Sequence, residues 1–218
     1  MRKENRTYYF SVEGETEKWY LDWLQKSINA DPSASCTVKL DSKIQKDPLS
    51  YSKKIAIIGK TEITHVFDYE SSEPIHKQQF QTTLDRMKQS EKLGKNIKYR
   101  LGYSNFAFEL WIILHMADCN GPLSHRRQYL ASLNKAYNEH FENLAQYKQE
   151  SNFKKILGKL TLNNVRQAIS RSKAIMQKNS EDPGHIPQQY KGYKYYRENP
   201  SLSIWESIER ILKDCNLQ

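Results

Sequence analysis

Strand-like and helix-like patterns alternate through the first half of the chain, and this alternation constrains the fold more than any other feature. Segments rich in aromatic and β-branched residues predict strands at residues 7–12, 35–40, 63–68 and 96–104. Helical patterns separate them at residues 16–28, 48–59 and 73–94. Because parallel strands need long crossover connections, which are usually helices, we expect an α/β fold with a mostly parallel sheet flanked by helices.

After Ser104 the strand-like patterns stop. The remaining helical patterns lie at residues 105–117, 125–138, 152–177 and 201–214. We therefore expect an α/β core over residues 1–118 and a helical, basic extension over residues 119–218 that packs on it.

Acidic residues follow the first and third predicted strands. Glu13 comes directly after residues 7–12, and Asp68 and Glu70 end the stretch HVFDYE. If these two strands are neighbours where the strand order reverses, the three carboxylates converge at the carboxyl edge of the sheet. Converging carboxylates resist ionising together unless a cation lies among them, and oxygen ligands alone suit Mg²⁺ or Mn²⁺. The alternative is that the glutamates of VEGETE favour a helix N-terminus, where carboxylates complement the helix dipole.

The whole chain has a net charge of +9, and its basic residues are clustered rather than evenly spread. Residues 151–180 contain no acidic residue, and their basic residues are Lys154, Lys155, Lys159, Arg166, Arg171, Lys173 and Lys178. Such clustering is typical of a nucleic-acid partner, although a solvated helix face looks the same.

The segment YKGYKYYR, residues 190–197, mixes tyrosines with basic residues. Tyr193, Lys194 and Arg197 suit stacking on unpaired bases together with phosphate contact. The same mixture also suits a strand or loop that clamps the extension to the core.

The sequence offers no apolar signal region at its start, and the apolar run FAFELWIILHMA is too short to cross a bilayer. The three cysteines lie far apart, without metal-ligand spacing. We expect a soluble cytoplasmic protein with reduced thiols and no membrane partner.

The motifs VEGETE, HVFDYE, YSNFAFELWIILH and NPSLSIWESIERIL together resemble the RloB-like family, over essentially the whole chain. These bacterial proteins are associated with abortive infection and phage defence and are built on the Toprim fold, a metal-binding α/β module. The resemblance implies that Glu13 is a general acid/base or metal ligand and that Asp68 is the first acid of a D-x-D motif. Glu70 departs from that motif, in which the second acid is Asp. Glu17 matches a position that can help to hold a second ion.

Glu109 is the one charged residue between Phe106 and Leu114, in a predicted helix that is apolar on nearly every side. A buried charge must be paired, hydrogen-bonded or neutralised. Glu109 therefore either pairs with a core Arg or His or lies beneath the metal site and orients it. Ser104 and Asn105 stand where the cap of this helix is expected, and Ser104 is a further candidate to support the site.

These observations favour a Mg²⁺-dependent nuclease that uses Glu13, Asp68 and Glu70. Nucleotidyl transfer is a second class, and a non-catalytic nucleic-acid sensor or regulatory subunit is a third. The sequence contains no phosphate-loop ATPase motif, and the resemblance implies a separate ATPase partner of the AAA or SMC-like kind. DNA, messenger RNA and tRNA all remain open as substrates, and the oligomeric state is unspecified.

Overall fold

A five-stranded sheet organises the computed structural model of the protein, which describes residues 3–57 and 59–218. The strand order is β2-β1-β3-β4-β7. The strands are β1 (Glu4–Val12), β2 (Cys36–Ile44), β3 (Thr61–Asp68), β4 (Ile97–Asn105) and β7 (Ser201–Leu202). The first four pair in parallel and β7 runs antiparallel to β4. The predicted α/β fold, with a mostly parallel sheet and flanking helices, is confirmed.

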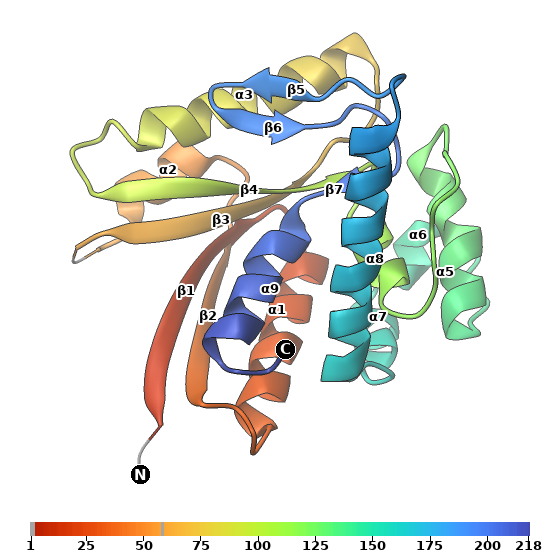
Figure 1. Ribbon diagram of the computed structural model, residues 1–218, viewed down its shortest axis with the longest axis horizontal. Helices are drawn as coiled ribbons and strands as arrows, with labels where there is room; N and C mark the ends of the chain where they lie inside the picture. The colour runs from red at the N-terminus through yellow and green to blue at the C-terminus, as the bar shows by residue number, and fades with distance from the viewer. Residues whose placement is uncertain (1–2, 58) are drawn as a thin grey trace.

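Helices cover both faces of this sheet (Figure 1). The connecting helices are α1 (Glu15–Ala30), α2 (Pro48–Lys54) and α3 (Pro74–Ser90). Phe80, Leu84 and Met87 of α3 pack against one face, in a cluster with Ile63 of β3 and Tyr99 of β4. The opposite face is covered by α1 and by helices from the second half of the chain.

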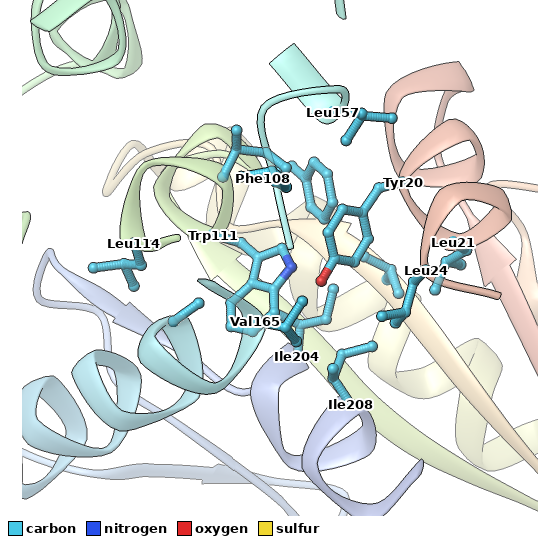
Figure 2. Packing of buried hydrophobic residues seen from close by; sticks show 14 of the residues in the cluster. Tyr20, Leu21, Leu24, Phe108, Trp111, Leu114, Leu157, Val165, Ile204 and Ile208 are labelled. Atoms are coloured by element: carbon cyan, nitrogen blue, oxygen red, sulfur yellow. The ribbon is translucent and has the colours of Figure 1, made fainter. Parts of the chain in front are cut away.

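The larger apolar cluster joins the two halves of the chain (Figure 2). Tyr20 of α1 meets the ring of Trp111 edge-on, with centroids 6.1 Å apart. Val165 and Ile208 come from the second half of the chain and lie in the same cluster, so the helical extension packs on the sheet through a continuous core.

The second half consists mainly of helices. They are α4 (Glu109–Leu114), the 3₁₀ turn η1 (Arg126–Gln128), α5 (Tyr129–Tyr137), α6 (Leu144–Tyr147), α7 (Glu150–Leu157), α8 (Leu162–Glu181) and α9 (Ile204–Asp214). The continuous helix expected over residues 152–177 is wrong, because Thr161 caps a new helix: its side chain accepts from the Asn164 N–H, and the Asn164 side chain accepts from the Thr161 N–H.

The prediction that strands stop after Ser104 is also wrong. Residues 201–202 form β7, which pairs with the end of β4 and extends that strand through Ser104 and Asn105. These two residues are therefore strand residues, not the expected helix cap, and α4 begins only at Glu109. The short strands β5 (Gln188–Tyr190) and β6 (Tyr193–Tyr195) form a hairpin between α8 and β7.

The described residues contain no helix that is both long enough and apolar enough to span a membrane.

Candidate active site

The chain reverses its strand order between β1 and β3. From β1 it passes to β2 on one side, then crosses to β3 on the other, so β1 and β3 are neighbours at a topological switch point. Val12 stands beside Val66 in the parallel register, which places Glu13 and Asp68 at the same edge. The backbone N–H of Asp68 donates to Glu13 Oε2 at 3.3 Å. The expected pairing of the first and third strands is therefore confirmed.

Glu17 bends back over the start of α1. Its Oε2 accepts a hydrogen bond from Thr16 Oγ1 at 3.1 Å, and the residue is buried. A Cβ at position 14 would lie 3.2 Å from this Oε2, so Gly14 leaves room for the carboxylate. Glu15 in the same turn is exposed. The acidic turn thus does two things at once: it places acids in the first turn of a helix, and it directs Glu17 toward the sheet edge.

Glu109 reaches this edge from α4. It is 1% exposed, and its Oε1 lies 2.9 Å from Lys148 Nζ, whose side chain is 43% exposed. The counter-charge is therefore a lysine at the end of α6, not a core Arg or His. Glu109 Oε2 is buried and has no hydrogen-bond partner among the described residues. Ser104, the other predicted supporting residue, stands beside Asp68 in the β3–β4 register, and its buried Oγ has no partner in the part of the chain that the structure describes.

The carboxylates repel one another. Burial raises the pKa of Glu13 to about 7, and the charge of Glu17 adds to this, whereas the hydrogen bond from the Asp68 N–H opposes it. Burial, followed by the charges of Glu13 and Glu17, raises the pKa of Asp68 well above its ordinary value. Burial also raises the pKa of Glu17. For Lys148, burial lowers the pKa, but the charges of Glu109 and Asp68 outweigh it, and the pKa is raised. We call Glu13, Glu17, Asp68 and Glu109 the acid edge.

Glu70 lies apart from this group. Its Oε2 is 3.4 Å from Arg126 Nη1 and 3.5 Å from His76 Nε2, and its side chain is 40% exposed. The charge of Glu70 raises the pKa of Glu13 less than the charge of Glu17 does. The structure thus joins Glu13 and Asp68 closely, while the second acid of the predicted D-x-E pair faces two basic side chains.

The residue types at the acid edge fit a hard divalent cation, because all offer carboxylate oxygens in a strongly negative setting. Within residues 3–57 and 59–218, no three His, Cys, Asp or Glu side chains are already arranged to hold one ion. Mutual repulsion and the two ion pairs, Glu109 with Lys148 and Glu70 with Arg126, account for this arrangement. Binding an ion therefore requires side-chain rotations within a donor set of suitable chemistry.

Six of the seven basic residues predicted in α7, α8 and the turn between them have partners inside the protein, whereas Lys178 forms no side-chain hydrogen bond or ion pair with the described residues. Lys154 pairs with Glu150, Lys155 and Lys159 pair with Glu139, and Lys173 pairs with Glu209. Arg166 donates to the Leu217 carbonyl, and Arg171 to Asp118 and the Leu114 carbonyl. We call these six residues, Lys154, Lys155, Lys159, Arg166, Arg171 and Lys173, the basic helical face.

The β5–β6 hairpin clamps the chain onto α3. Tyr190 donates to Asp85 at 2.9 Å, and Tyr195 is buried against Phe80 with ring centroids 4.8 Å apart. Of the predicted nucleic-acid residues in this segment, Tyr193 and Arg197 are half-buried and Lys194 is exposed.

Sequence reasoning missed three basic residues near the acid edge. Lys148 lies just outside the acid-free stretch of residues 151–180. Arg126 and Arg127 fall within the helical pattern of residues 125–138, which gives no sign of a binding site. The adjacent pair of arginines was the one available signal. Together with Glu109, these residues line a groove of about 760 Å³.

Comparison with known proteins gives one match. The sequence model of the RloB-like protein family matches residues 8–211, which is nearly the whole chain. No curated protein and no solved structure matches it significantly. The match includes both acidic motifs, the apolar segment around Glu109 and nearly all of α9, and the chain therefore belongs to the RloB-like family.

Proposed function

We propose that the protein is a divalent-metal-dependent nuclease that cleaves phosphodiester bonds of DNA or RNA at the acid edge. The observation that carries the proposal is the convergence of Glu13, Glu17 and Asp68 at the switch point of a parallel sheet, with pKa values raised by burial and mutual repulsion. Ligands of open α/β sheets bind at such switch points. Strongly perturbed carboxylates in one cluster are typical of functional sites.

Glu13, Glu17 and Asp68 would hold Mg²⁺ or Mn²⁺, and Glu70 could join them after leaving Arg126. The bound ion would supply positive charge and Lewis-acid polarisation at the phosphodiester oxygens. Burial raises the pKa of Glu13 to about 7 in the metal-free protein, as suits a general acid or base near neutral pH, whereas a bound cation would lower this pKa, so Glu13 would serve either as proton carrier or as ligand. The Asp68 N–H orients this carboxyl by donating to its Oε2.

Two further expectations belong to this proposal. The basic helical face would attract the polyanion over a distance, because its exposed ion pair between Lys154 and Glu150 is weak and can exchange for phosphate. Family membership supports a role in abortive infection against phage, beside a separate ATPase of the AAA or SMC-like kind.

A cleavage panel tests the function. Single-stranded DNA, duplex DNA and tRNA are incubated with the protein in Mg²⁺, Mn²⁺ or EDTA. We expect metal-dependent cleavage of at least one substrate, and a loss of about 100-fold or more in Glu13→Gln and Asp68→Asn. Glu15→Gln is the matched control, since Glu15 lies in the same turn but is exposed, and it should cleave normally. Cleavage that survives in Glu13→Gln would contradict the proposal.

One observation favours a second candidate, a non-catalytic nucleic-acid sensor or regulatory subunit of an ATPase. Glu109 and Glu70 are already paired with Lys148 and Arg126, so the site carries part of its own counter-charge. Tight nucleic-acid binding without cleavage in any metal would select this candidate.

A further inference from the structure

A groove adjoins the acid edge. It encloses about 760 Å³ between η1 and α5 on one side and residues 142–148, which include α6, on the other. Its charged lining consists of two acidic residues, Glu109 and Glu142, and three basic ones, Arg126, Arg127 and Lys148. Leu130, Leu144 and Ala145 add an apolar wall. Because Glu109 belongs both to this lining and to the acid edge, the groove opens directly beside the candidate active site.

Two basic residues of the groove form ion pairs with acidic residues. Lys148 Nζ lies 2.9 Å from Glu109 Oε1, and Arg126 Nη1 lies 3.4 Å from Glu70 Oε2. Arg127 is exposed. Its guanidinium forms no hydrogen bond or ion pair with any of the described residues. Among the described residues, the groove thus presents the unpaired guanidinium of Arg127. It also presents Lys148 and Arg126, which are paired with Glu109 and Glu70.

The groove also contains an unsatisfied acceptor. Glu109 is 1% exposed, and its Oε2 has no hydrogen-bond partner among the described residues. This oxygen is closed to solvent, so a hydroxyl or amino group of a ligand would reach it only after the Glu109 or Lys148 side chain shifts, and it would then offset the cost of a buried carboxylate oxygen without a donor. Cations that bind phosphate, an acceptor for a hydroxyl or amino group and an apolar wall together match the parts of a nucleotide.

We propose that this groove binds one or two nucleotides of an unpaired nucleic-acid strand, with Arg126, Arg127 and Lys148 on its phosphates. A volume of about 760 Å³ lies within the range of small-ligand pockets, about 300–1,000 Å³, which admits single nucleotides but no duplex. The inference deepens the proposed function, since it rests on the acid edge as the place where a bound strand is cut. It names unpaired strand as the substrate class.

Binding is tested without cleavage. Fluorescence anisotropy is measured in EDTA and low salt with the Glu13→Gln protein. The probes are labelled single-stranded RNA and DNA of the same sequence, each about 10 nucleotides long, and the matching DNA duplex. We expect both single strands to bind more tightly than the duplex. Arg127→Ala should weaken single-strand binding about tenfold, the effect of one charge-assisted phosphate contact, and the Arg126→Ala/Arg127→Ala double variant should weaken it further.

Two controls keep the test decisive. Lys135→Ala also removes one exposed cation, in the last turn of α5, but lies outside the groove lining, so it should change binding by less than about twofold. Thermal melts should show Arg127→Ala as stable as its parent, because no side-chain partner is lost. A tighter RNA complex would assign the Glu109 acceptor to the ribose 2′-hydroxyl within the same proposal.

Three results would overturn the proposal: no binding of any strand, equal loss in Arg127→Ala and Lys135→Ala, or a duplex that binds as tightly as single strands. Failure of the proposed function looks different. If Glu13→Gln still cleaves while Arg127→Ala weakens binding, the groove stands and the catalytic assignment fails. If Glu13→Gln is inactive while the groove variants bind like their parent, the groove fails alone.

Discussion

At the acid edge, Glu13, Glu17 and Asp68 lie close together, buried or half-buried. The charge of Glu17 raises the pKa of Glu13, and the charges of both glutamates raise the pKa of Asp68. On the basic helical face the opposite holds, since Lys154, Lys155 and the other basic residues there each contact an acidic side chain or a carbonyl of the same protein. The first region keeps like charges together at a cost in free energy of folding. The second uses unlike charges to fasten helices.

The comparison teaches that charge counted along the sequence does not locate a site. The densest run of basic residues is largely neutralised by partners within the fold. Strong repulsion between like charges instead arises among four acids that are scattered over nearly a hundred positions of the sequence. What marks the acid edge is the lack of sufficient counter-charge, with Lys148 as its nearest cation. The predictions below test that difference.

The largest effect on stability is expected from Lys148→Ala. It leaves Glu109 buried at 1% exposure without a counter-charge, which costs about 3–5 kcal/mol for a fully buried pair. Because Lys148 is 43% exposed, we expect the low end of that range, about 3 kcal/mol, in urea unfolding at neutral pH.

Glu109→Gln supplies the matched comparison. It also breaks the pair, but it removes a charge that repels Asp68 and Glu17, so it should cost only about 1 kcal/mol. The double variant should recover most of the stability lost in Lys148→Ala. A Lys148→Ala protein within about 0.5 kcal/mol of wild type would mean that the acid edge does not depend on this lysine.

The next effect concerns metal. Wild type should gain about 2.7 kcal/mol of stability when Mg²⁺ is present at 100 times its dissociation constant. Glu13→Gln should gain less than half of this, and in EDTA it should be at least as stable as wild type, since it relieves repulsion. Thermal melts with and without Mg²⁺ measure both. A Glu13→Gln protein that melts far below wild type in EDTA would make Glu13 a structural residue.

A smaller effect is expected from pH. The folded-state pKa of Glu13 is raised to about 7 from 4.5, so the folded protein holds this proton more tightly than the unfolded chain. The contribution to stability is present below pH 4.5 and is lost as pH rises through about 7. In EDTA, wild type should therefore lose about 1–2 kcal/mol more than Glu13→Gln over this window. Parallel curves for the two proteins would contradict the assignment.

The smallest effect belongs to the basic helical face. Lys154 and Glu150 form an i,i+4 pair in which both side chains are more than half exposed. Lys154→Glu should therefore change the free energy of unfolding by no more than about 0.5 kcal/mol, and less at high salt. A loss comparable with that of Lys148→Ala would erase the contrast between the two regions.

The sequence was sufficient for the four parallel strands of the sheet and for the two acids that meet at their carboxyl ends. Regular alternation predicted the four parallel strands, and the acids at the ends of residues 7–12 and 63–68 predicted the meeting of Glu13 and Asp68. The sequence did not predict a role for Lys148, Arg126 or Arg127. These residues lie at a helix end and in a 3₁₀ turn, where no periodicity or motif marks them. β7 could not be predicted, because a two-residue strand has no sequence pattern of its own and is defined only by its pairing with β4.

The pairing of β7 with β4 also sets an order of assembly. Ser104 stands beside Leu202, so this contact closes a very long loop, and such contacts form late and slowly. Until then β4 presents an open edge, which is the part of a sheet most prone to pair with another chain. During synthesis, β1 to β4 can pair while residue 202 is still inside the ribosome. Nascent chains that stall before β7 should therefore aggregate through the β4 edge, and the time that they spend in this state depends on how quickly residues 105–202 are translated.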